Sequence, residues 1–298
     1  MVLDSVVYGD EKQNRRKARI RFSLVLTMLI IFGLFVVIPF YWMMLTAFKT
    51  EAQVLTAPPI LWLNPLNWQF SNFATAMDTA PFLRYMGNTV LVSSISTVGT
   101  IFTTVFAAFA FARLNFNGRD FLFMILISTM MIPGEIFVIT NFLTVVELGW
   151  IQNQTYMNAI LAMTLPFMTS IFYIFFLRQS FRQIPDELYY AAKVDGTTDL
   201  KYLFKIMVPI ALPTIITITI LNAMGTWNAY IWPRLVTQQQ EFRLVSNGLR
   251  DAFSNIAGRI LYNEQMAAAL LVTFPLLVVF LLLKKYIIRG VSRSGIKG

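Results

Sequence analysis

The sequence has no cysteine and no histidine among its 298 residues, and few of its residues are charged. Without cysteine the chain can form no disulfide bond and has no thiol nucleophile, and without histidine it lacks a usual ligand of zinc and haem. Only 13% of the residues are charged, whereas a soluble domain carries about 25%. Apolar residues make up 57% of the chain and its mean hydropathy is +0.63, which together indicate a membrane protein.

The apolar residues are pooled into long runs. A helix needs about 20 apolar residues to cross the hydrocarbon layer, and in lipid its backbone must satisfy its own hydrogen bonds. The sequence therefore predicts an all-α integral membrane protein with a basic head (1–21), a transmembrane domain (22–283) and a tail (284–298). The predicted spans are residues 22–48, 88–112, 121–143, 156–177, 209–232 and 265–283.

The basic residues indicate the orientation of these spans. If the spans are right, about three quarters of the 24 Lys and Arg residues lie in the head, the tail and the two loops on the same side. The positive-inside rule then places both termini in the cytoplasm of a cell with a plasma (inner) membrane. The net charge of +9 is explained by these flanking residues, so it does not indicate nucleic-acid binding.

The cytoplasmic loop 178–208, between the fourth and fifth spans, is predicted to contain two helices. Pro185 can open the first helix, Asp186 and Glu187 favour its N-terminal end, and Gly196 suits a left-handed C-terminal cap. A second short helix is expected at about residues 198–207. Leu188, Ala191, Ala192 and Asp195 recur at helical spacing, and the two alanines would leave one face nearly flat. On spacing alone, this helix could dock another protein or lie against its own chain.

Ala191-Ala192, then Gly196, then Ile206 and Pro209 resemble the cytoplasmic loop of ABC importer membrane subunits. The resemblance implies that this loop inserts into a cleft of a separate ATPase subunit and transmits its motion. It assigns ATPase coupling to Glu187, Tyr190, Ala191, Ala192, Asp195 and Gly196. Tyr190 departs from the family, which has glutamate at that position, and Glu187 is the candidate to replace that carboxylate.

Further segments are similar to the six-span, maltose-importer type of carbohydrate ABC importer permease. They are residues 113–119, 131–134, 227–230 and 285–298. This resemblance implies a carbohydrate or polyol-phosphate substrate and a tail that contacts the ATPase through Gly295 and Lys297. It also implies a second homologous permease subunit, an ATPase dimer that binds ATP and Mg, and an extracytoplasmic solute-binding protein as partners.

The chain itself has no recognisable ATP site. Gly290 and Gly295 have the spacing of the glycines in a phosphate-binding loop, but Lys297 follows one place too late. The spans also lack paired carboxylates and a metal cluster, so an enzyme is disfavoured. We therefore expect a transport subunit with no catalytic residue, cofactor or metal of its own.

Polar residues within the spans are the candidates for a translocation path. Asn222, Trp227, Asn228 and Tyr230 combine amides with aromatic rings, which suits a sugar, although packing around Gly225 explains them about equally well. The hydroxyl-rich second span is better explained by helix packing than by contact with substrate. Glu135 is the one acid inside a predicted span, just after a likely helix break at Pro133-Gly134. A proton or ion relay through Glu135 would make the protein an ion-gradient-driven secondary transporter, which is the alternative function.

Overall fold

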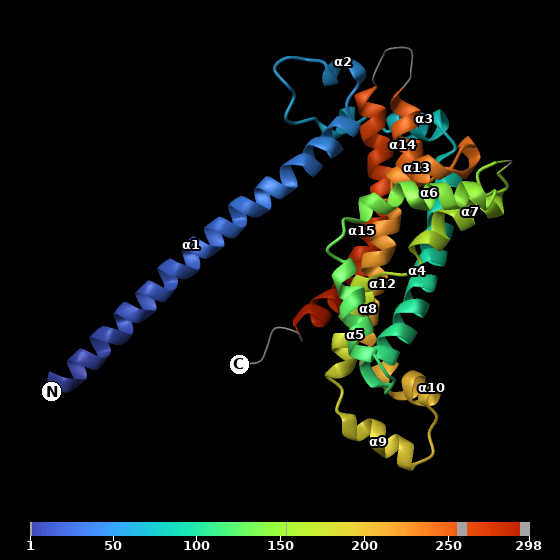
Figure 1. Cartoon of the computed structure of the whole chain (residues 1–298). Helices are drawn as coiled ribbons and strands as arrows, with labels where there is room; N and C mark the ends of the chain where they lie inside the picture. The colour runs from blue at the N-terminus through green and yellow to red at the C-terminus, as the bar shows by residue number, and fades with distance from the viewer. Residues whose placement is uncertain (1, 153, 255–260, 293–298) are drawn as a thin grey trace. The chain divides into compact units, whose positions relative to one another are not determined.

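The computed structural model describes residues 2–152, 154–254 and 261–292, and over these residues it is helical without any β-strand (Figure 1). This confirms the all-α fold class. The chain divides into two compact units, residues 1–76 with 261–270 and residues 77–260 with 271–298. Each unit is described below by itself.

Helices long and apolar enough to cross a membrane occur as continuous and as bent segments. The continuous ones are Lys17–Ala47 within α1 (Val2–Ala47), α4 (Phe82–Arg113) and Tyr262–Leu282 within α15 (Tyr262–Ser292). Three further pairs qualify together but bend by 81°, 54° and 79°: Arg119–Thr129 with Gly134–Glu147, Tyr156–Phe167 with Ile171–Arg182, and Asp199–Ile210 with Leu212–Trp227. The described residues thus provide six spans if each bent pair counts as one.

The bends lie beside prolines, which remove a helical hydrogen bond and clash with the preceding turn. Pro133 lies in the first break, as the sequence predicts, and Pro166 lies in the 3-10 turn Leu165–Phe167 beside the second. The fifth predicted span bends at Ala211, between Pro209 and Pro213. The helix that follows runs without interruption from Leu212 through Gly225 to Trp227.

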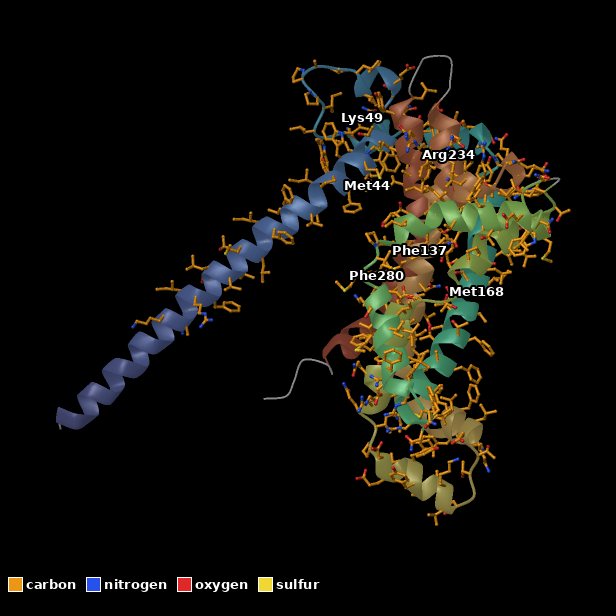
Figure 2. The ribbon with its side chains drawn as sticks, in the orientation of Figure 1. Met44, Lys49, Phe137, Met168, Arg234 and Phe280 are labelled. Atoms are coloured by element: carbon orange, nitrogen blue, oxygen red, sulfur yellow. The ribbon has the colours of Figure 1, made fainter. Side chains whose placement is uncertain are left out.

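In the first unit, α1 leads into a loop that contains α2 (Glu51–Val54), a 3-10 turn (Pro65–Asn67) and the start of α3 (Ser71–Thr79). The side-chain amide of Asn72 donates to the carbonyls of Ala47 and Lys49, each at 2.8 Å. The Lys49 ammonium donates to the carbonyl of Ile60 at 2.7 Å and lies 4.6 Å from the centre of the Trp42 ring (Figure 2). Burial lowers the pKa of Lys49 below its ordinary value.

The core of the second unit lies where α4 packs against α8 (Ile171–Arg182) and α12 (Leu212–Trp227), which we call the central bundle. Gly99 permits close packing there, because a Cβ atom at Gly99 would come within 2.6 Å of the sulfur of Met168 (Figure 2). The other helices of this unit are α5 (Arg119–Thr129), α6 (Phe137–Glu147), α7 (Tyr156–Thr164), α9 (Asp186–Val194), α10 (Asp199–Tyr202), α11 (Val208–Ile210), α13 (Ile231–Val236) and α14 (Val245–Ser254).

Short helices close the central bundle at its two ends. Figure 1 shows α9 and α10 at one end, and α13 and α14 at the opposite end. At the α13 end, Arg234 pairs with Asp251 of α14 at 2.5 Å, and Arg243 reaches the same carboxylate at 2.9 Å (Figure 2). The hydrogen bond to Asp251 raises the pKa of Arg234 above its ordinary value.

Candidate functional site

Helix α9 lies where the sequence predicts a helix in the loop 178–208. Pro185 precedes it, Asp186 and Glu187 occupy its first turn, and Gly196 follows its end with a φ of +71°. Only glycine adopts that left-handed conformation without strain, while the acids favour the positive end of the helix dipole. The expected second helix is a composite of α10, a π-helical turn at Leu203–Met207 and α11, and the hydroxyl of Thr198 caps its start.

The two alanines of α9 lie in different environments, which corrects the expectation of one flat docking face. Ala192 is 7% exposed and packs into the hydrophobic core beside α4, α8 and α12, whereas Ala191 is exposed. Successive residues of a helix are about 100° apart, so Ala191 lies well round the helix from Ala192 and outside the narrow face that packs on the core. One face of α9 therefore lies against its own chain, and the other face is free to dock another protein. The exposed face, which we call the coupling surface, consists of Glu187, Leu188, Tyr190, Ala191, Val194 and Asp195.

A cluster of polar and aromatic contacts fixes α9 to α10. The Tyr189 hydroxyl donates to Asp199 at 2.8 Å, and the Lys193 ammonium lies 2.7 Å from the same carboxylate. The Tyr189 ring also packs edge-on against Tyr202, with the ring centres 5.0 Å apart. Burial, followed by the hydrogen bond to Asp199, raises the pKa of Tyr189, and that carboxylate also raises the pKa of Lys193. Lys193 therefore stays charged at neutral pH.

Tyr190, which stands where the resembling family has glutamate, is 62% exposed. Its ring contacts Tyr189 with the ring centres 5.9 Å apart, and it lies on the coupling surface together with Glu187. Glu187 thus supplies a carboxylate one turn earlier on the exposed part of the helix. Whether Glu187 replaces the family glutamate stays a prediction.

Of the candidate path residues, Asn222 lines a partly open cavity. This cavity has a volume of about 230 Å³ and is bordered by the polar groups of Ser96, Tyr173 and Thr226, with Phe167 and Trp232 as its aromatic walls. The Asn222 amide donates to the hydroxyl of Thr97 on α4 at 3.2 Å. Asn222 therefore contributes to helix packing and also lies beside the aromatic residues of this cavity. Its contact with substrate stays a prediction.

The remaining path candidates do not converge on this cavity. Trp227 lines a separate, largely apolar hollow of about 280 Å³ beside Pro275 of α15. The Asn228 amide bonds back to the carbonyl of Met224 at 2.9 Å, and the guanidinium of Arg250 covers the Tyr230 ring at 5.2 Å. Glu135 is exposed in the 3-10 turn Gly134–Ile136, at the break between α5 and α6. The candidates of the fifth span are close in sequence, but their side chains have different surroundings.

The hydroxyls of α4 mostly bond to neighbouring elements of the same chain. Thr103 donates to the carbonyl of Met168 at 2.6 Å, Ser93 donates to Ala223 at 3.2 Å, and Thr89 accepts from the backbone of Val245 at 2.9 Å. Most of these side chains are buried, although Ser94 is exposed. This pattern agrees with the packing interpretation of the second span.

Two residues of this region were not proposed as functional from the sequence. Arg113 and Arg178 are buried at the same end of the central bundle as α9. From the sequence both residues indicate topology, and Arg113 also belongs to one of the segments that resemble the permease family. The sequence offers one signal for a functional role of these two arginines, which is that each lies directly after an apolar span. Gly295 and Lys297, predicted to contact an ATPase, lie outside the described residues.

A family model described as "binding-protein-dependent transport system inner membrane component" matches residues 99–293, which include the loop 178–208 and α12. The chain belongs to this family. It is therefore a multi-pass inner-membrane transport component, and membership does not favour an ion-gradient-driven secondary transporter using Glu135.

Named relatives cover nearly the whole chain. A probable ABC transporter permease of Mycoplasma pneumoniae is 33% identical over 90% of this chain and 86% of its own length. The sn-glycerol-3-phosphate transport system permease protein UgpE of Yersinia pestis is 28% identical over 90% of this chain and 94% of its own length. A crystal structure of a bacterial ABC transporter for import of the acidic polysaccharide alginate aligns with a TM-score of 0.80 and 23% identity, covering 91% of this chain and 98% of the other. That structural likeness confirms the permease fold.

Proposed function

We propose that this chain is the permease subunit of an ATP-driven, binding-protein-dependent importer of carbohydrate. Together with a second homologous permease subunit it forms the translocation path, and an extracytoplasmic solute-binding protein delivers the substrate. A separate ATPase dimer binds ATP and Mg and carries out hydrolysis, so this chain needs no cofactor of its own. The family, whose description specifies dependence on a binding protein, and the relatives named as ABC transporter permeases support this proposal.

The observation that carries the proposal is the division of α9 into a packed face and an exposed face. Ala192 and Tyr189 hold the helix on its own core, while Leu188, Tyr190 and Val194 remain exposed. A loop helix that only covered its own protein would not present this many large apolar side chains to water. Binding of an ATPase to this surface would let closure of the motor tilt α9 and switch the bundle between two access states.

We place both termini and α9 in the cytoplasm of a cell with a plasma (inner) membrane. The bias of basic residues supports this orientation, because the loop that contains α9 belongs to the side rich in Lys and Arg. The coupling surface then faces the compartment that contains ATP.

For the substrate we favour a carbohydrate. The Yersinia pestis relative is named for the transport of sn-glycerol-3-phosphate, and the similar solved structure is named for the import of alginate. Both compounds carry several hydroxyl or acidic oxygens. In this chain the cavity beside Asn222 combines an amide and hydroxyls with Phe167 and Trp232. Such a surface suits hydrogen bonding to sugar hydroxyls and stacking against a sugar ring.

Purification of the chain from native membranes, with identification of the co-purifying proteins, tests this proposal. We expect an ATPase and a second permease, and we expect both ATPase recovery and ATP-driven sugar uptake in vesicles to be lost in Ala191→Arg, which places a bulky charge on the coupling surface. Ala74→Arg, on an exposed position of α3, is the matched control. A chain that purifies alone and moves solute in ATP-free vesicles under an ion gradient, with uptake abolished by Glu135→Gln, would contradict the proposal and support the alternative.

A further inference from the structure

Arg113, the last residue of α4, joins three elements at the cytoplasmic end of the central bundle. Its side chain is 5% exposed, and one terminal nitrogen donates to the carbonyl of Phe181 at 2.9 Å and also to that of Ile184. The other terminal nitrogen pairs with the carboxylate of Asp186, the first residue of α9. One side chain therefore contacts the last turn of α8, the connection after it and the beginning of α9.

The guanidinium suits this position because helix ends carry partial charges and unpaired backbone groups. The final carbonyls of α8 have no partner within the helix and form the negative end of its dipole, so a cation stabilises them. Asp186, at the positive end of α9, is 67% exposed, which limits the strength of its pair with Arg113. The two buried carbonyl contacts are thus the stronger part of this arrangement. Lysine has one compact ammonium and could not reproduce the planar fork.

Arg178 makes a second connection at the same end. Its guanidinium donates to the carbonyl of Phe111 on α4 at 3.1 Å and lies 3.8 Å from the centre of the Phe123 ring on α5. It also lies 3.8 Å from the Asp120 carboxylate. Arg113 and Arg178 therefore connect α4 to α8 in both directions, since each arginine comes from one helix and donates to backbone carbonyls at the end of the other.

We propose that Arg113 is a positioning residue that makes α9 and α4 move as one body, with Arg178 extending the same rigid block to α5. This inference rests on the proposed function, because it concerns how motion of α9 reaches the membrane helices. Without Arg113, the connection between α8 and α9 would absorb part of the displacement. ATP hydrolysis would then continue while less of it would be converted into transport.

A distance measurement within the chain tests the rigid block without relying on transport. Because the chain has no native cysteine, spin labels can be attached at Asn117→Cys, beyond the end of α4, and at Leu200→Cys on α10, which the contacts of Asp199 with Tyr189 and Lys193 fix to α9. Both positions are exposed and lie outside the coupling surface. In the full chain purified with its co-purifying subunits, we expect one narrow distance distribution. Arg113→Ala should broaden it, Arg113→Lys should broaden it less, and Asp186→Asn should have the smallest effect. Arg182→Gln, which removes an exposed arginine of the same helix as Arg178, is the matched control and should leave it unchanged.

The functional readout is the number of sugar molecules imported per ATP hydrolysed by the assembled transporter. For Arg113→Ala we expect this ratio to fall about tenfold, the size of an ordinary coupling free energy between sites, while ATP hydrolysis per complex persists. An unchanged distance distribution in assembled Arg113→Ala complexes would overturn the proposal. A proportional loss of ATP hydrolysis and sugar uptake in Arg113→Ala would also overturn it, because that result would mean that Arg113 has a purely structural role. Failure of the proposed function would instead appear as absence of an ATPase from the native complex.

Discussion

The two ends of α4 are fixed to the rest of the chain by different chemistry. At the end near α9, the charged side chain of Arg113 contacts the end of α8 and the beginning of α9. At the opposite end, the neutral amide of Asn88 donates to the carbonyls of Glu241 and Arg243, at 2.9 and 3.0 Å, and accepts from the Tyr156 hydroxyl at 2.8 Å. Both side chains are buried, so exposure does not distinguish them.

The difference follows from the groups that Asn88 and Arg113 contact. Asn88 meets loop carbonyls and a hydroxyl, and a neutral amide satisfies such groups at a much smaller desolvation cost than a charge. Arg113 lies between the negative end of one helix dipole and a carboxylate, and this surrounding charge favours a buried guanidinium. We therefore expect changes near Asn88 to affect stability, and changes near α9 to affect the conversion of ATP hydrolysis into transport.

The largest expected effect is at Ala192, on the packed face of α9. Ala192→Leu adds three carbon atoms at a buried position, so α9 must move away from the core and the coupling surface moves with it. We expect ATP-driven uptake to be abolished while the chain still inserts into the membrane, measured as uptake per inserted permease. Ala74→Leu, on exposed α3, is the control and should transport normally. Normal uptake by Ala192→Leu would contradict the coupling role of α9.

The next effect is expected at the opposite end of α4, at Gly248 of α14. A Cβ atom at Gly248 would come within 2.1 Å of the ring of Tyr85, which is fully buried on α4, so Gly248→Ala requires a backbone shift. The overpacking should cost about 1–3 kcal/mol of stability, of which the better helix propensity of alanine offsets up to about 1 kcal/mol. Thermal unfolding in detergent micelles measures the loss. Gly248→Ala combined with Tyr85→Leu, which removes the clashing ring atoms, should regain part of it.

Asn88→Ala should have an effect of similar size on unfolding and directly tests whether the two ends of α4 differ in function. It leaves two loop carbonyls and the Tyr156 hydroxyl without their amide partner, which should cost about 1–3 kcal/mol. We expect a lower melting temperature but an unchanged number of sugar molecules imported per ATP hydrolysed. A fall in that ratio, with normal stability, would mean that the two ends of α4 do not differ in function.

The smallest effect is expected from Lys193 at neutral pH. Its hydrogen bond to Asp199 raises its pKa, so its contribution is fully present below the ordinary lysine value of 10.5 and is lost as the pH rises through the raised pKa. A spin label at Val194→Cys should therefore show constant mobility across neutral pH and greater mobility only in strong alkali. In Lys193→Gln the alkaline increase should disappear. An increase between pH 6 and 8 in the native chain would contradict this assignment.

Much of the fold was predictable because membrane-spanning segments depend on local sequence. Apolar runs, the basic residues beside them and the Pro133-Gly134 break were readable from the chain. The same holds for α9, since Pro185, its acidic first turn and Gly196 are local signals for helix ends. The bend at Ala211 was missed, although Pro209 and Pro213 flank it, because prolines near span ends are compatible with either a straight or a broken helix.

The candidate site was less predictable. Helical spacing gave the periodicity of α9 but not which face packs, so Ala191 and Ala192 were placed together although only Ala192 is buried. Trp227, Asn228 and Tyr230 are neighbours in sequence, yet their surroundings differ. Trp227 lines a hollow that Pro275 also lines, the Asn228 amide bonds to the Met224 carbonyl, and Arg250 covers the Tyr230 ring. The direction of a side chain depends on which elements surround its helix, and those elements come from distant parts of the chain.

Local sequence preferences were sufficient to predict that this protein is helical, that it crosses the membrane several times and that the loop 178–208 contains a capped helix. These properties follow from hydropathy, charge and backbone preferences, which act over a few turns of the chain. Only the tertiary structure decided that Arg113 contacts Phe181, Ile184 and Asp186, and that Asn222 faces a cavity. The physical reason is that a buried charge or amide is stabilised only by partners brought to it through packing, and in this chain those partners lie many residues away.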